Sequence, residues 1–111
     1  EMTETQNSAR EIAALYETIL ARKTADRSDS YSAQLLADLP RAARKLGEEA
    51  SETMVAALSG SGEALAGEAG DLLYHLLVVL VARDVTLDQL TDVLAARAGT
   101  SGLGEKAARD A

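Results

Sequence analysis

The stretch LPRAARKLGEEASETMVAALSGSGEALAGEAGDLLYHLLVVLVA, residues 39–82, decides the fold, because it contains two helical segments joined by four small residues. Asp38 is a suitable N-cap, so we expect a first helix over about 39–58. Residues 59–62 end this helix, and a second helix follows over about 63–83. A connection of this length is typical of two antiparallel helices that lie side by side.

Helix signals also occur on either side of this pair. Ser8, followed three residues later by Glu11, forms a capping-box pattern, and apolar residues then recur at helical spacing, which predicts a helix over about 9–24. Thr86 and Gln89 repeat the pattern and predict a last helix.

No segment has the alternating, β-branched pattern of a strand, so the expected fold class is all-α. The four helices, together with a short helical turn at 31–37, are predicted to form a single domain over residues 8–98. Residues 99–111, which contain three glycines, are predicted to be a loose C-terminal tail.

Residues 72–82 form the longest apolar run, interrupted only by His75. A membrane-spanning helix needs about 20 apolar residues, so this run predicts a buried segment and no membrane contact. A helix that is apolar on all sides must be covered on all sides, and three partner helices of so short a chain cannot do this. We therefore expect a helical bundle completed by dimerisation, as a homodimer or a larger homo-oligomer.

The composition excludes several classes of function. The chain has 11 basic and 18 acidic residues and a net charge of −7, which disfavours nucleic acid as a partner. It has no cysteine, and therefore no thiolate zinc site, and its single histidine cannot build a two-histidine metal site. The absence of cysteine and of a signal-peptide pattern indicates a cytoplasmic protein.

Carboxylates concentrate on the facing sides of the two central helices. At about 100° per residue, Glu48, Glu49 and Glu52 fall within one arc of ~100°. Glu68 and Asp71 share one face of the second helix. Residues that face each other across the antiparallel connection have numbers that sum to about 120. This spacing brings Glu52 opposite Glu68, and Glu49 opposite Asp71.

Such a cluster of like charges beside the most apolar segment has two explanations. The acids can form a solvated surface, with Lys45 and Glu49 as an ordinary ion pair four residues apart. Alternatively, partly buried like charges bind a cation, and the matched acidic pairs favour this explanation. Carboxylate oxygens are ligands that suit Mg²⁺ or Mn²⁺.

The motif K-x-G-E-E-A-x-E at 45–52, followed by E-x-x-D-L-L-Y-H-L-L-V at 68–78, closely resembles the phosphoribosyl-ATP pyrophosphohydrolases of histidine biosynthesis. That family belongs to the all-α, MazG-like nucleotide pyrophosphatases. The similarity includes the Ser-Tyr-Ser segment at 30–32 and covers nearly the whole chain. It implies hydrolysis of phosphoribosyl-ATP between its α and β phosphates, which gives phosphoribosyl-AMP and pyrophosphate.

The resemblance also implies roles for individual residues. The Mg²⁺ ligands, with Mn²⁺ as a possible substitute, are Glu49, Glu52, Glu68 and Asp71. The catalytic carboxylates are Glu48 and Glu49, with Glu48 as a further ligand or as the base that orients the attacking water. The residues that bind the nucleotide substrate are Arg22, Lys23, Ser30, Tyr31, Ser32 and Lys45.

Three positions need separate interpretation. Gln34 stands where members of the family usually carry a lysine, and residues 39–40 stand where they usually have a glycine, so the exact substrate preference stays open. His75 can either hydrogen-bond the Asp71 carboxylate or be a core histidine bonded to another acceptor, and we favour the core histidine.

Two other functions compete with this prediction. One is a MazG-like pyrophosphatase that acts on other (deoxy)nucleoside triphosphates. The other is a non-catalytic helical bundle used for dimerisation, in which the acids are only solvated surface. The sequence leaves open the number of metal ions, the identity of the base and any assembly beyond a dimer.

Overall fold

The computed structural model describes residues 1–99 and 109, and within these residues the regular structure is entirely helical, which confirms the predicted all-α class. The helices are α1 (Glu4–Ala21), α2 (Tyr31–Leu36), α3 (Leu39–Ser59), α4 (Gly62–Ala82) and α5 (Leu87–Arg97), with 3₁₀ turns η1 (Arg22–Thr24) and η2 (Arg27–Asp29). The predicted tail lies almost wholly outside the described residues, and the domain limits of 8–98 stay a prediction.

The predicted start of the first helix is wrong. Helix α1 begins at Glu4, because Thr3 and Gln6 form the capping box: the Gln6 N–H donates to Thr3 Oγ1 and the Thr3 N–H donates to Gln6 Oε1. Ser8 lies inside the helix, where its hydroxyl donates to the Glu4 carbonyl. Two capping-box patterns overlap in this stretch, and the earlier one satisfies more backbone donors of the longer helix.

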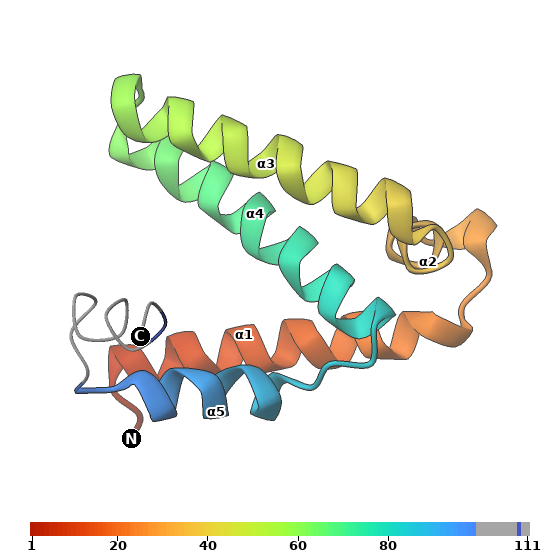
Figure 1. Ribbon diagram of the computed structural model, residues 1–111, viewed down its shortest axis with the longest axis horizontal. Helices are drawn as coiled ribbons and strands as arrows, with labels where there is room; N and C mark the ends of the chain where they lie inside the picture. The colour runs from red at the N-terminus through yellow and green to blue at the C-terminus, as the bar shows by residue number, and fades with distance from the viewer. Residues whose placement is uncertain (100–108, 110–111) are drawn as a thin grey trace.

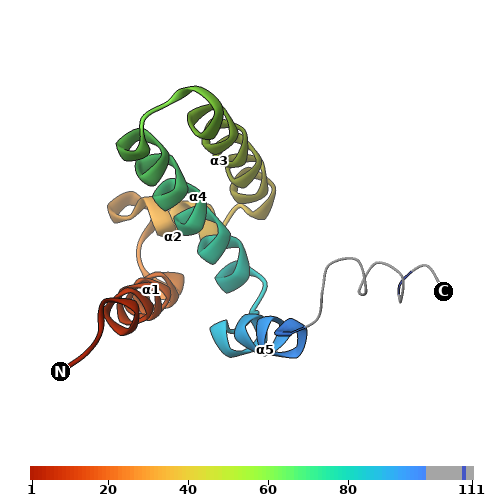
Figure 2. The ribbon, with the colours of Figure 1, turned by 90° about the vertical axis from the view of Figure 1, so that its left-hand side faces the viewer.

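Helices α3 and α4 form the predicted antiparallel hairpin, and they run side by side in both views (Figures 1 and 2). Asp38 caps α3 by accepting from the Arg41 N–H at 3.2 Å, and Ser61 caps α4 by accepting from the Ala64 N–H at 3.1 Å. The turn requires Gly60, since a Cβ at this position would lie 2.8 Å from a carbonyl oxygen of α3. The hairpin therefore follows from its caps and its connection.

The core lies where α1 and α2 pack against the C-terminal half of α4. Tyr16 of α1 also donates its hydroxyl to the Val85 carbonyl at 2.9 Å, which ties α1 to the segment that follows α4. The buried apolar cluster consists of Tyr16, Ile19, Leu35, Ala42, Leu77, Val78 and Val81. The filling is aliphatic apart from one tyrosine, as the composition requires.

Helix α4 is long and apolar enough to cross a membrane, by length and composition only, with a mean hydropathy of 1.6. It nevertheless carries Glu68 and Asp71 near its middle, and its second half packs into the core. The core helices of soluble proteins also meet these criteria when they are mostly buried, whereas 22% of this apolar window is buried within the chain.

Helix α5 covers little of the core, because none of its residues is buried. Figure 2 shows α5 standing apart from α1, although the two overlap in Figure 1. Val93 and Leu94 of α5 are exposed, and so are three apolar residues at the end of α3, Met54, Val55 and Leu58. A single chain therefore leaves much apolar helix surface uncovered.

Candidate active site

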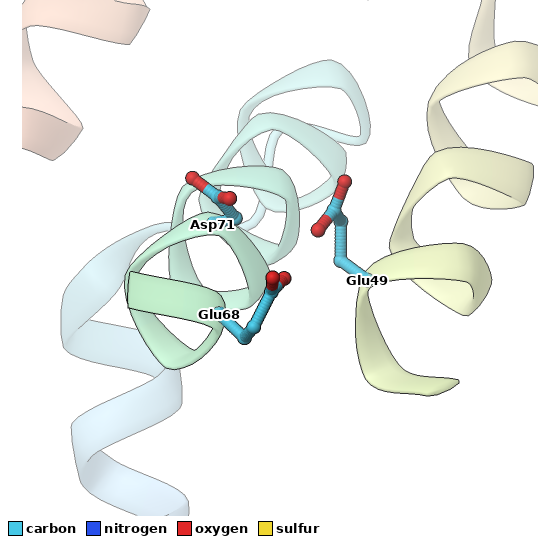
Figure 3. Close-up of side chains that lie close together, drawn as sticks. All are labelled: Glu49, Glu68 and Asp71. Atoms are coloured by element: carbon cyan, nitrogen blue, oxygen red, sulfur yellow. The ribbon is translucent and has the colours of Figure 1, made fainter. Parts of the chain in front are cut away.

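Three carboxylates meet near the middle of the hairpin. Glu49 of α3 and Glu68 and Asp71 of α4 each place one carboxylate oxygen within 4.8 Å of the other two. Figure 3 shows Glu49 reaching from α3 toward the side of α4 that carries the other two side chains. The antiparallel arrangement thus brings Glu49 and Asp71 together, as the spacing along the sequence predicts.

The cluster is partly buried and lacks donors. Glu49 is only 8% exposed, and neither its Oε2 nor Glu68 Oε2 has a hydrogen-bond partner among the described residues. A buried carboxylate oxygen without a donor is costly, because it has lost its hydration without compensation. Two such oxygens beside a third carboxylate fit a site that takes a cation, and oxygen ligands of this kind suit Mg²⁺ or Mn²⁺.

Glu52 extends this cluster by one helical turn. Loss of hydration, followed by a hydrogen bond with Glu52 and the charges of Glu52, Asp71 and Glu49, raises the pKa of Glu68 above its ordinary value. The folded chain therefore binds a proton at this carboxyl group more tightly than the unfolded chain does. Glu52, the fourth predicted metal ligand, thus interacts with Glu68 but does not belong to the group of three carboxylates whose oxygens lie within 4.8 Å of one another.

Glu48 lies outside the group and faces solvent. Its carboxylate accepts from Lys45 Nζ at 3.1 Å, and this ion pair raises the pKa of Lys45. Lys45 thus pairs with Glu48, three residues away, and not with Glu49 as the alternative of a solvated surface requires, while Glu49 turns toward α4. Glu48 and Glu49, although adjacent in the motif, therefore point in different directions: Glu48 toward solvent and Glu49 toward α4.

Thr53 fixes the two helices to each other beside the cluster. Its hydroxyl lies 2.7 Å from the Glu49 carbonyl and 3.1 Å from the Glu68 carbonyl, so its hydrogen is shared between α3 and α4. The sequence analysis does not predict this contact. The available signal is that Thr53 follows Glu49 by four residues, the spacing at which a threonine hydroxyl donates to a carbonyl of its own helix.

The family model described as phosphoribosyl-ATP pyrophosphohydrolase matches residues 12–98. The chain belongs to this family. A phosphoribosyl-ATP pyrophosphatase of Caulobacter sp. (strain K31) is 59% identical over 92 residues, which cover 83% of this chain and 86% of the relative. The protein of that name from Erythrobacter litoralis is 57% identical over 93 residues, covering 83% of this chain and 89% of the relative. The chain is therefore a pyrophosphohydrolase by family.

In this family member, His75 is the buried core histidine that we favoured. Its Nδ1 lies 2.7 Å from the backbone carbonyl of Asp71, not from the carboxylate. Because a carbonyl only accepts, Nδ1 carries the proton and Nε2 is left as an acceptor, 3.5 Å from the Tyr31 hydroxyl. His75 therefore links the backbone of the site to α2.

The predicted Ser-Tyr-Ser segment lies against α4 near the cluster. Ser30 caps α2 by accepting from the Ala33 N–H, Tyr31 stacks on Tyr74, and the Ser32 hydroxyl hydrogen-bonds the Tyr74 hydroxyl. Ser30 is thus a helix cap, whereas Tyr31 is 43% exposed and its side chain is accessible to a ligand.

The structure does not bring Arg22 and Lys23 to the carboxylates of the same chain. Lys23 forms an ion pair with Asp84, which holds the pKa of that carboxyl below its ordinary value. Asp84 follows α4 and lies thirteen residues beyond Asp71, or roughly 20 Å at the rise of a helix. Gln34, which stands where members of the family usually carry a lysine, donates its side-chain N–H to the Arg27 carbonyl.

Proposed function

We propose that this chain hydrolyses phosphoribosyl-ATP to phosphoribosyl-AMP and pyrophosphate, with Mg²⁺, as an enzyme of histidine biosynthesis in the cytoplasm. The observation that carries the proposal is the pair of buried, unpartnered oxygens of Glu49 and Glu68 within the carboxylate cluster. Membership of the phosphoribosyl-ATP pyrophosphohydrolase family supports the substrate.

Glu49, Glu68 and Asp71 would hold the cation, with Glu52, the fourth predicted ligand, next to Glu68. When bound, Mg²⁺ supplies positive charge to the phosphate oxygens and makes a water more acidic. The acidic side chains alone would repel the substrate, so the same carboxylates that attract the cation make binding of a triphosphate possible.

Glu48 is the proton acceptor in this proposal. The family resemblance implies this role for Glu48, whose half-exposed carboxylate pairs with Lys45 on the solvent side of α3. The water oxygen bonds to the α phosphorus and its proton passes to the Glu48 carboxylate. The bond between the α phosphorus and the bridging oxygen breaks, so pyrophosphate leaves with that oxygen. Lys45, whose Nζ lies 3.1 Å from the Glu48 carboxylate, orients that carboxylate.

A second copy of the chain covers the exposed end of α3. Leu58 is 83% exposed and Met54 and Val55 are each 59% exposed. Val55 also lines a shallow groove that reaches Glu52 and Glu68, so a partner on this face would exclude water from one side of the cluster. Light scattering at micromolar concentration should give at least twice the chain mass of 11.6 kDa. A mass of one chain would contradict the homodimer.

Pyrophosphate release tests the activity. We expect turnover of phosphoribosyl-ATP that needs Mg²⁺ or Mn²⁺ and exceeds turnover of dATP and dUTP. Glu49→Gln should lower kcat by about 10²-fold or more, since it removes a buried ligand. Glu63→Gln, an exposed glutamate in the first turn of α4, is the matched control and should keep the wild-type rate.

Two results would contradict the proposal. Equal rates with phosphoribosyl-ATP and dATP would favour the pyrophosphatase of broad specificity. Absence of turnover with an intact fold would favour the non-catalytic bundle.

A further inference from the structure

Arg41, in the first turn of α3, has no carboxylate partner among the described residues. Its guanidinium carbon lies 5.7 Å from the centre of the Tyr31 ring, a cation–π contact. Asp38, the nearest acid in sequence, accepts from the backbone N–H of Arg41 as the cap of α3. The positive charge of Arg41 is therefore available to an anion.

The ring under Arg41 is fixed to α4. Tyr31 stacks on Tyr74 with ring centres 6.5 Å apart and meets His75 edge-on at 6.3 Å. His75 in turn donates to the backbone carbonyl of Asp71. Three consecutive contacts thus hold the guanidinium at a defined place relative to the carboxylate cluster.

Arg41 lies on the same stripe of α3 as the cluster. Arg41, Lys45 and Glu49 follow one another at intervals of four residues, so they share a face, and Arg41 is about 12 Å from Glu49 along the helix. The charge of Lys45 between them is paired with Glu48. The face therefore has a cation-binding end at Glu49 and a free positive group at Arg41.

The proposed substrate has two anionic ends. Phosphoribosyl-ATP carries a triphosphate on one side of the base and a ribose-linked phosphate on the other, so one metal cluster cannot hold both. Gln34 of α2 is uncharged, and its side-chain amide donates to the Arg27 carbonyl. A guanidinium is well suited to the second phosphate, since it offers parallel donors to two oxygens.

We propose that Arg41, held over Tyr31, binds the ribose-linked phosphate of phosphoribosyl-ATP and thereby distinguishes this substrate from ordinary nucleoside triphosphates. The inference rests on the proposed function, because it assigns the second anionic end of the same substrate. It makes Arg41 a specificity-determining residue that the sequence motifs do not include.

Parallel kinetics with phosphoribosyl-ATP and ATP test this assignment. Arg41→Gln should lower kcat/KM for phosphoribosyl-ATP by about 10- to 100-fold, the effect of losing charge-assisted hydrogen bonds. The same variant should change kcat/KM for ATP by less than about twofold, since ATP lacks the second phosphate. Arg41→Lys should recover part of the loss, because it restores the charge without the planar donor pair.

Arg44→Gln is the matched control, since Arg44 is exposed, lies three residues further along α3 and forms no part of the site. This variant should leave kcat/KM for both substrates unchanged. Equal losses of kcat/KM for both substrates in Arg41→Gln, or no loss for either, would overturn the role of Arg41. A wild-type enzyme that does not prefer phosphoribosyl-ATP to ATP would instead contradict the proposed function, and with it any need for discrimination.

Discussion

The two halves of α4 differ in what they contribute to the protein. Residues 62–71 include no buried side chain and carry Glu68 and Asp71, whereas every buried residue of α4, His75 included, lies in 75–81. The first half faces α3 across the carboxylate cluster, and the second half forms the core with α1 and α2. Chemistry and stability are thus separated along one helix.

The separation has a physical reason. A carboxylate cluster without a bound cation destabilises the folded chain, because its members repel one another and have lost hydration. Full burial of an aliphatic side chain stabilises the fold by about 1.5–3 kcal/mol, and the second half of α4 buries Leu77, Val78 and Val81. The apolar half therefore offsets the instability of the acidic half.

The largest expected effect on stability comes from the second half. Leu77→Ala leaves a cavity at a side chain with no exposure and should lower the free energy of unfolding by about 2–5 kcal/mol, measured by urea denaturation. Leu65→Ala, at a half-buried leucine of the first half, should cost far less. Comparable losses of unfolding free energy in the two variants would contradict the difference in stability between the two halves of α4.

A smaller effect of opposite sign is expected at Glu68. Because the pKa of Glu68 is raised in the folded chain, the folded state holds this proton more tightly than the unfolded state does, and stability falls as pH rises from the ordinary value of 4.5 through the raised pKa. Glu68→Gln removes this loss. In EDTA, the variant should therefore melt above the wild type at neutral pH, with the difference shrinking toward pH 4.5.

Mg²⁺ sharpens the test at Glu68. Added Mg²⁺ should raise the melting temperature of the wild type, since a ligand that binds only the folded state stabilises it, and should raise that of Glu68→Gln much less. A melting temperature of Glu68→Gln below that of the wild type, in EDTA at neutral pH, would mean that the carboxylate stabilises the fold. That result would contradict the claim that the acidic half of α4 destabilises the cation-free chain.

The hairpin and its carboxylates were predictable from local signals. Caps at Asp38 and near residue 62, together with the connection between the helices, define where each helix begins and therefore which acids face each other. Similarly, helical spacing identified the apolar run of α4. These features depend on residues close in sequence, where spacing determines geometry.

Other features depend on contacts that spacing does not encode. Lys23 meets Asp84 across 61 residues, and Arg41 meets Tyr31 of a different helix. The start of α1 was missed because Thr3 and Ser8 offer equivalent caps and only the folded chain selects one. Long-range partners of exposed, flexible basic side chains are the part that the sequence alone leaves undetermined.

The short connection between α3 and α4 also has a consequence for the order of folding. Since the loop at 59–62 closes over few residues, the entropy lost in pairing these helices is small, and the hairpin can form rapidly from local contacts. Its docking onto α1 and α2 requires contacts across much longer stretches of chain. A nascent chain is therefore expected to bring Glu49, Glu68 and Asp71 together before its core exists, so that the proposed cation site forms early in folding.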